Sequence, residues 1–159
     1  MEMEKVVRLA KDVVLKQGYH LPQLVLCGEQ GNGAMMIEGF PNEYEKKVKT
    51  MFLAGVETKR RCNVGKLSKV FFVLETWMVT LEKGEKITPA RQHPRRIETL
   101  VISCLDISTK EQMVTSLEYI RDASGTLREI KDHVLPDGAT TARAESPLLP
   151  AFVAGYNTG

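Results

Sequence analysis

Cysteine is scarce in this chain, and its number is odd. Three cysteines occur in 159 residues, Cys27, Cys62 and Cys104, which does not fit a framework of paired disulfide bonds. Cys27 and Cys104 lie inside apolar runs, where a thiol behaves as a small hydrophobic side chain. The composition therefore favours a reduced protein of the cytoplasm.

Long apolar runs are also absent. No stretch approaches the roughly 20 consecutive apolar residues that cross a bilayer. Charges interrupt the apolar residues of the opening MEMEKVVRLAKDVV, whereas a secretory signal needs an unbroken apolar core. We therefore expect a soluble protein without membrane association.

Recognisable catalytic motifs are missing as well. The three histidines, His20, His93 and His133, are far apart in sequence and have no His or Cys at the short spacing that zinc sites show. There is no Gly-x-Ser-x-Gly nucleophile motif. The glycine-rich residues 28–33 precede a strand pattern instead of a helix, so we interpret Asn32-Gly33 as a hairpin turn, not a phosphate-binding loop. We predict no catalytic residues, no metal and no cofactor.

The net charge of +2 is small, but it is unevenly distributed. Residues 59–110 carry eleven Lys and Arg against five Asp and Glu, which keeps nucleic-acid binding as an alternative function. The candidate residues form two groups, one before and one after the predicted central strand: Lys59, Arg60 and Arg61, then Arg91, His93, Arg95 and Arg96. The strand separates them by about 35 Å, and no aromatic residues suited to base stacking lie among them. A solvated surface is therefore favoured.

Apolar residues are plentiful, at 43% of the chain, which suffices for one globular domain. Residues 3–17 have apolar positions at helical spacing, and Gly18 follows where a left-handed C-cap belongs. Residues 42–61 predict a second amphipathic helix, with Asn42 as N-cap and Glu45 at the capping-box spacing.

Strand patterns fill most of the remaining chain. Residues 21–40 contain two short apolar runs, and residues 69–81 are apolar at both odd and even positions, as in a strand covered on both faces. Residues 97–107, 111–122 and 126–132 continue the series. The connections are too short for repeated crossover helices. We predict an α+β two-layer sandwich: a mainly antiparallel sheet of five to six strands, two long helices and a short C-terminal helix.

The composition changes at Pro136. We predict a single α+β domain over residues 1–135, and over residues 136–159 a flexible tether followed by an apolar tail, with Ser146 and Pro147 beginning a short helix. The tail docks either on its own sheet, which is the simpler interpretation, or on a second copy or another protein. The candidate contact residues are Leu148, Leu149, Phe152, Val153 and Tyr156.

Glu75 and Glu98 are candidate buried carboxylates. On an alternating strand Glu75 shares a face with Trp77, which we expect in the core, so its carboxylate needs a charged partner or a raised pKa. A symmetric loop between the two central strands places Glu75 opposite Ser103 and Glu98 opposite Thr80, about 16 Å apart and on opposite faces. That separation argues against a glycosidase pair and favours an arginine partner for Glu75.

These features together predict a non-catalytic accessory or assembly protein of the cytoplasm. It would contact another protein, or a second copy of itself, through the apolar tail and an exposed sheet face. Nucleic-acid binding through the basic middle segment is the alternative. A small enzyme that combines Glu75 or Glu98 with His93 and an arginine is the least supported function.

Overall fold

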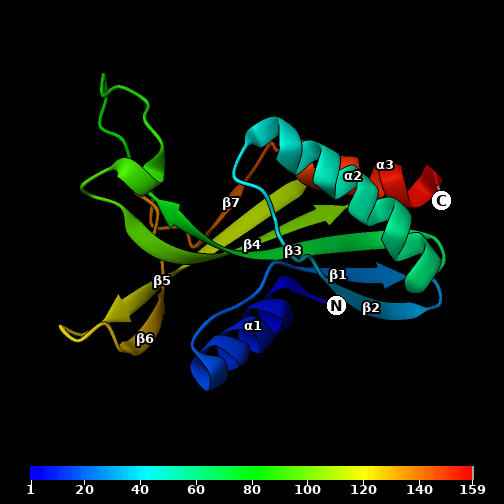
Figure 1. Cartoon of the computed structure of the whole chain (residues 1–159), viewed down its shortest axis with the longest axis horizontal. Helices are drawn as coiled ribbons and strands as arrows, with labels where there is room; N and C mark the ends of the chain where they lie inside the picture. The colour runs from blue at the N-terminus through cyan, green and yellow to red at the C-terminus, as the bar shows by residue number, and fades with distance from the viewer. Residues whose placement is uncertain (159) are drawn as a thin grey trace.

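The computed structural model describes residues 1–158 and contains three α-helices, a 3-10 helix and seven strands (Figure 1). The helices are α1 (Met3–Gln17), α2 (Tyr44–Arg61) and α3 (Leu148–Thr158), with the 3-10 helix η1 (Ala90–Gln92). The strands are β1 (Gln23–Gly28), β2 (Gly31–Met36), β3 (Leu67–Met78), β4 (Ile97–Asp106), β5 (Gln112–Arg121), β6 (Leu127–Asp132) and β7 (Thr141–Arg143).

The strands form one antiparallel, curled sheet in the order β2-β1-β3-β4-β5-β6. β6 pairs with one half of β5, and β7 pairs with the other half along the same edge. The predicted α+β class with a mainly antiparallel sheet is confirmed. The seventh strand is β7, which lies inside the segment that we predicted as a tether.

Helices cover both faces of the sheet, so the two-layer arrangement is not confirmed. α1 packs on one face through Val6, Ala10 and Val14, against residues such as Phe71 of β3. α2 and α3 lie on the opposite face, where Phe72 of β3 joins their cluster (Figure 1). Successive strand residues point to opposite faces, and this alternation explains why β3 is apolar at both odd and even positions.

The first helix follows its sequence pattern, and the second begins later than predicted. α1 ends at Gly18, whose φ of 86° is the left-handed conformation of a C-cap. α2 begins at Tyr44 with Glu43 as N-cap and no capping side-chain hydrogen bond. The capping box predicted from Asn42 and Glu45 was therefore wrong.

The turn between β1 and β2 consists of Glu29 and Gln30, because Gly28 and Gly31 form the last pair of the ladder. The prediction of a turn at Asn32-Gly33 was wrong. Gly33 lies inside β2, where an added Cβ would collide with the Cys62 sulfur. A glycine needed for close packing resembles a glycine needed for a turn when only the sequence is considered.

The C-terminal segment docks on its own chain. Leu149, Phe152 and Tyr156 are almost fully buried in the cluster between α2, α3 and the sheet. The Tyr156 hydroxyl accepts a hydrogen bond from the Val64 N–H at 3.0 Å and donates one to the Gly65 carbonyl at 2.9 Å. Gly159, the last residue of the predicted tail, lies outside the described residues.

α2 and α3 cross at a pair of glycines. A Cβ added to Gly155 of α3 would collide with the Phe52 carbonyl of α2, and a Cβ added to Gly55 of α2 would collide with the Phe152 carbonyl of α3. The two backbones therefore approach more closely than side chains on both helices would permit.

Candidate binding site at the open edge of strand β3

The pairing of β3 with β4 decides where the two candidate carboxylates lie. Glu75 pairs with Leu100, and Glu98 pairs with Trp77. Directly paired residues share a face of the sheet, so both carboxylates lie on the face of α1, two positions apart along the ladder. The predicted pairing of Glu75 with Ser103, on the face opposite Glu98, was wrong.

The physical reason is that β3 ends earlier than predicted. Its last residue is Met78 and not Leu81, so the connection between the strands runs over residues 79–96. Ile97 consequently pairs with Met78 and not with Leu81.

β3 has an open edge beyond the end of β1. The pairing between β1 and β3 stops at Gln23 and Val73, whereas β3 continues to Met78. Within residues 1–158, residues 74–78 pair only with β4. One side of this segment therefore has no neighbouring strand.

The backbone groups that face the open edge belong to Glu75 and Trp77. Successive residues of an antiparallel strand direct their backbone N–H and C=O groups alternately to the two sides. The Ser68 carbonyl accepts a backbone hydrogen bond from the residue after β4, at 2.9 Å. The Thr76 carbonyl accepts a side-chain hydrogen bond from the Thr99 hydroxyl of β4, also at 2.9 Å. Even-numbered residues thus bond toward β4, and Glu75 and Trp77 bond outward.

Two adjoining hollows follow this edge. One, of about 520 Å³, lies between the start of α2, the end of β3 and η1. The other, of about 510 Å³, is bounded by residues 37–42 and by Leu74. They share Asn42, Lys47, Glu75 and Thr76. The edge therefore lies along a continuous groove.

Glu98 has an ion-pair partner on the face of α1, and that partner is Arg121 of β5. The Arg121 guanidinium contacts both oxygens of Glu98, at 2.9 and 2.5 Å, and this carboxylate raises the pKa of Arg121. We predicted an arginine partner for Glu75, but the arginine on this face pairs with Glu98 instead. Arg121 was not singled out from the sequence, because its place beside Glu98 depends on the pairing of three strands.

Glu75 forms no ion pair within the described residues. The hydroxyl of Tyr119 is buried on the same face without a hydrogen-bond partner among residues 1–158. Burial, and secondly the nearby Glu75 carboxylate, raise the pKa of Tyr119. Glu75 is therefore a carboxylate that borders this groove without a charged partner among residues 1–158 and lies close to the Tyr119 hydroxyl.

Trp77 is not a core residue. Its side chain is 43% exposed, and the Arg96 guanidinium lies 5.0 Å from its ring centre. The expectation of burial was wrong because the strand continues beyond the part of the sheet that α1 covers. Arg91 borders the same groove.

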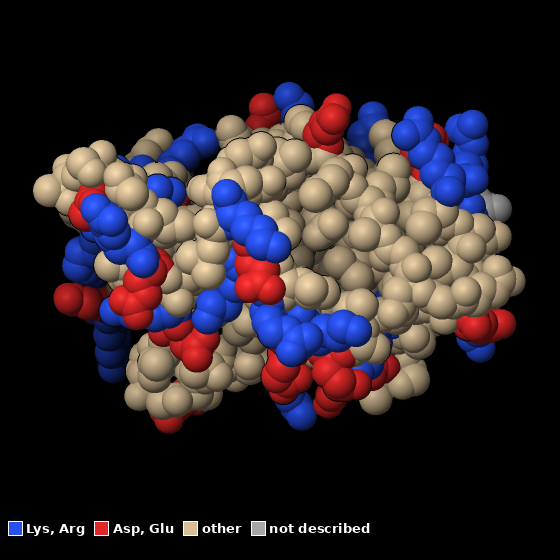
Figure 2. Space-filling model, turned by 90° about the horizontal axis from the view of Figure 1, so that it is seen from below, with Lys and Arg blue, Asp and Glu red and all other residues tan. Residues whose placement is uncertain are grey.

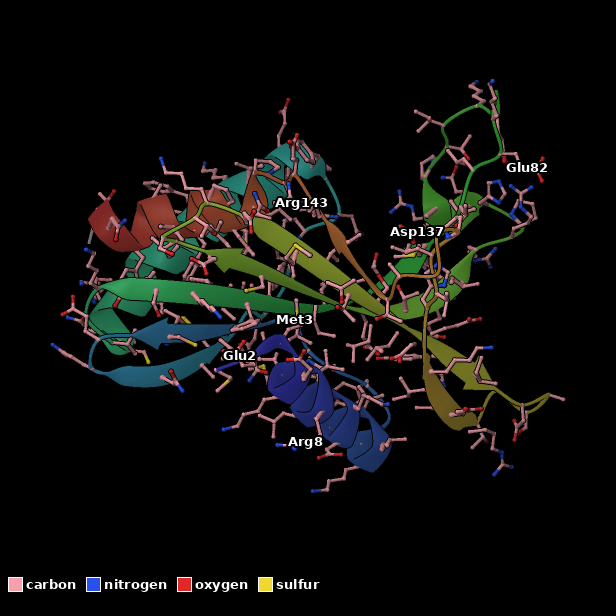
Figure 3. The ribbon with its side chains drawn as sticks, turned by 180° about the vertical axis from the view of Figure 1, so that it is seen from behind. Glu2, Met3, Arg8, Glu82, Asp137 and Arg143 are labelled. Atoms are coloured by element: carbon pink, nitrogen blue, oxygen red, sulfur yellow. The ribbon has the colours of Figure 1, made fainter. Side chains whose placement is uncertain are left out.

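The connection between β3 and β4 projects from the sheet, with Glu82 on its outer part (Figure 3). Its carboxylate Glu85 contacts His93 Nε2 and Arg95, both at 2.5 Å. His93 Nδ1 accepts a hydrogen bond from the Arg95 N–H, so Nε2 is the nitrogen that donates to Glu85. The backbone of Glu82, followed by His93 and Arg95, lowers the pKa of Glu85 to about 2. His93 and Arg95 thus stabilise the loop and do not line the groove.

The other basic group lies at the far end of β3, at the end of α2. Arg60 and Arg61 both pair with Glu57, and the Lys59 ammonium lies 4.6 Å from the Tyr156 ring centre. Intramolecular contacts thus engage most of the basic residues that the sequence singled out. Nucleic-acid binding stays a prediction.

The predicted tail contacts divide by burial. Leu149, Phe152 and Tyr156 are buried inside the chain, whereas Leu148 and Val153 are half-buried beside them. In this conformation the three buried residues have no surface for a second protein.

Among residues 1–158, no three His, Cys, Asp or Glu side chains are arranged to hold a metal ion. No helix in that part of the chain has both the length and the apolar character needed to span a membrane. No protein-family model, curated protein or solved structure matches this chain.

Proposed function

We propose that this chain is a non-catalytic protein-binding module that captures an extended segment of another protein at the open edge of β3. The observation that carries the proposal is the unpaired edge over residues 74–78, which lies beside a continuous groove. An added strand gains affinity from backbone hydrogen bonds and specificity from the pockets for alternate side chains.

The edge has room for a short strand. Five residues of β-strand span about 17 Å, and the outward N–H and C=O groups of Glu75 and Trp77 are the available partners. On the α1 face, side chains of the added strand would meet the Glu75 carboxylate and Trp77, which favours a basic or aromatic residue there. On the other face they would meet Asn42 and Lys47.

The test uses random linear heptapeptides displayed on phage, selected on the wild-type protein. An enriched peptide is synthesised, and its Kd is measured for the wild type, Glu75→Ala and Glu75→Pro. Both variants lose the carboxylate, but only proline loses the outward N–H while leaving the ladder to β4 intact. Circular dichroism confirms that both variants fold.

Glu75→Pro should bind at least about fivefold more weakly than Glu75→Ala, because one backbone hydrogen bond is worth about 1 kcal/mol. In NMR spectra the peptide should shift the amide signals of Glu75 and Trp77. Equal affinities for the two variants would contradict strand addition. Failure to enrich any peptide would remove the proposal.

A hydrolase that uses a carboxylate pair is a second candidate, favoured by one observation. Glu75, Glu98 and Arg91 border the same hollow. Against it, Arg121 holds Glu98 in an ion pair, whereas one member of a glycosidase pair must carry a proton. Turnover of aryl glycosides that is lost in both Glu75→Gln and Glu98→Gln would favour this candidate over strand capture.

Two sequence predictions are kept within the proposal. A cytoplasmic setting agrees with the three cysteines, all of which are free thiols. An accessory role in an assembly agrees with a site that binds an extended segment and holds no preformed catalytic set.

A further inference from the structure

The two terminal strands of the sheet differ sharply in charge. β6 has the sequence LREIKD, and charged side chains commonly protect a sheet edge from pairing with another chain. β2 has the sequence GNGAMM, without charge or proline, and among residues 1–158 it pairs only with β1. The outer edge of β2 therefore lacks the charges and proline that usually prevent an edge strand from pairing with another chain.

An apolar surface adjoins this edge. A hollow of about 520 Å³ lies between α1 and the β1–β2 hairpin, with Val13, Val25 and Ala34 among its lining residues. Leu9 on its α1 side is 47% exposed, and Met36 of β2 is 43% exposed. Seen from the side of α1, the surface to the right, over the hairpin, is hollowed and largely free of charged side chains (Figure 2).

We propose that a second copy of this chain pairs with β2 antiparallel, about a two-fold axis, and so joins the two sheets into one. A two-fold contact brings a surface against itself, so a charge on or beside the axis faces a like charge. An uncharged strand avoids that repulsion. A charged peptide gains nothing from this edge, in contrast to the groove at β3.

The backbone fixes the register. Gly28 and Gly31 close the hairpin, and the Ile37 N–H bonds to the Pro22 carbonyl on the β1 side. Odd-numbered residues therefore bond toward β1, and Asn32, Ala34 and Met36 bond outward.

With Ala34 on the axis, Ala34 pairs with Ala34 of the second copy, and Asn32 of each copy pairs with Met36 of the other. All outward N–H and C=O groups of these three residues are then paired. Their side chains lie on the α1 face, so each exposed Met36 covers the Asn32 end of the other copy's hollow.

The test exploits the position of Ala34 on the axis. The full chain should have twice its monomer mass of 17.8 kDa in size-exclusion chromatography with light scattering. Ala34→Lys and Ala34→Glu should each be monomeric because like charges oppose one another, and an equimolar mixture should form a heterodimer. Ala34→Val, an uncharged strand former, is the matched control and should stay dimeric. Circular dichroism checks that every variant is folded.

Each other outcome overturns the proposal. A wild-type chain that remains monomeric at about 100 µM has no such interface of physiological strength. Dimers that persist in both charged variants place the contact elsewhere. Charged monomers that do not combine when mixed exclude Ala34 from the axis. The β3 groove does not enter these measurements, so they are independent of the proposed function.

Discussion

Replacing Gly155 with alanine should destabilise the protein, although the same change stabilises most helices. An ideal Cβ on Gly155 would lie 2.8 Å from the Phe52 carbonyl carbon and 3.2 Å from its Cα, and closer still to its oxygen. These neighbours are backbone atoms of α2, so no side-chain rotation can relieve the overlap. α2 and α3 would have to separate.

The magnitude follows from two opposing terms. Alanine is favoured over glycine inside a helix by about 1 kcal/mol. Overpacking a well-packed core costs about 1–3 kcal/mol, and a clash between two backbones belongs at or above the upper end of that range. We expect a net loss of about 2 kcal/mol, which corresponds to a fall in Tm of about 4–8 °C for a chain of this size.

The measurement is thermal or urea unfolding of wild type, Gly155→Ala and Ala154→Gly. Ala154 is the exposed neighbour of Gly155 on α3, and its change to glycine should cost about 1 kcal/mol through helix propensity alone. A methyl group therefore stabilises position 154 and destabilises position 155. An increase in the Tm of Gly155→Ala would refute the close crossing of the helices. Gly55→Ala should act in the same direction, and the double variant should lose less than the sum of the two losses, because the first change already separates the helices.

Three further outcomes are expected. Tyr156→Phe should lower the free energy of unfolding by about 1–3 kcal/mol, because the buried Val64 N–H loses its acceptor; denaturant titration that shows no loss would contradict this. The pKa of Glu85 is lowered from 4.5 to about 2, so its contribution to stability is complete above pH 4.5 and is lost as the pH falls toward 2; the Tm difference between wild type and Glu85→Ala should shrink over that window, and a constant difference would exclude this linkage. Burial raises the pKa of Cys104 to about 11, so iodoacetamide at pH 8 should label it far more slowly than a cysteine in a short peptide, as peptide mass spectrometry can check.

The existence and type of the long elements, which depend on local sequence, were predicted well. The Asn32-Gly33 turn, the Asn42 cap and the pairing of β3 with β4 were not. The helix over residues 3–17 and its end at Gly18 follow from spacing and a glycine cap, which are properties of neighbouring residues. The pairing of β3 with β4 depends instead on how many residues each strand contributes to a long connection. An error of three positions in that estimate placed Glu98 on the face opposite Glu75, whereas in the structure the two carboxylates share a face.

The candidate groove could not be predicted from the sequence for the same reason. Trp77 has apolar neighbours, which predicted burial, but its exposure depends on where α1 and β1 end relative to β3. The open edge exists because β3 continues beyond the end of its pairing with β1. Glu75 was recognised from its position in an apolar strand, whereas Arg121 and Tyr119 beside it required the order of the strands.

The contact between Tyr156 and Val64 joins residues 92 positions apart in the sequence. This sequence separation predicts the order in which parts of the protein fold. β4, β5 and β6 pair with their neighbours in the chain through short connections, whereas docking α3 on α2 closes a loop whose entropy costs about 4 kcal/mol. Local hairpins should therefore form before that closure. A substitution at the glycine crossing would then accelerate unfolding while leaving the refolding rate nearly unchanged.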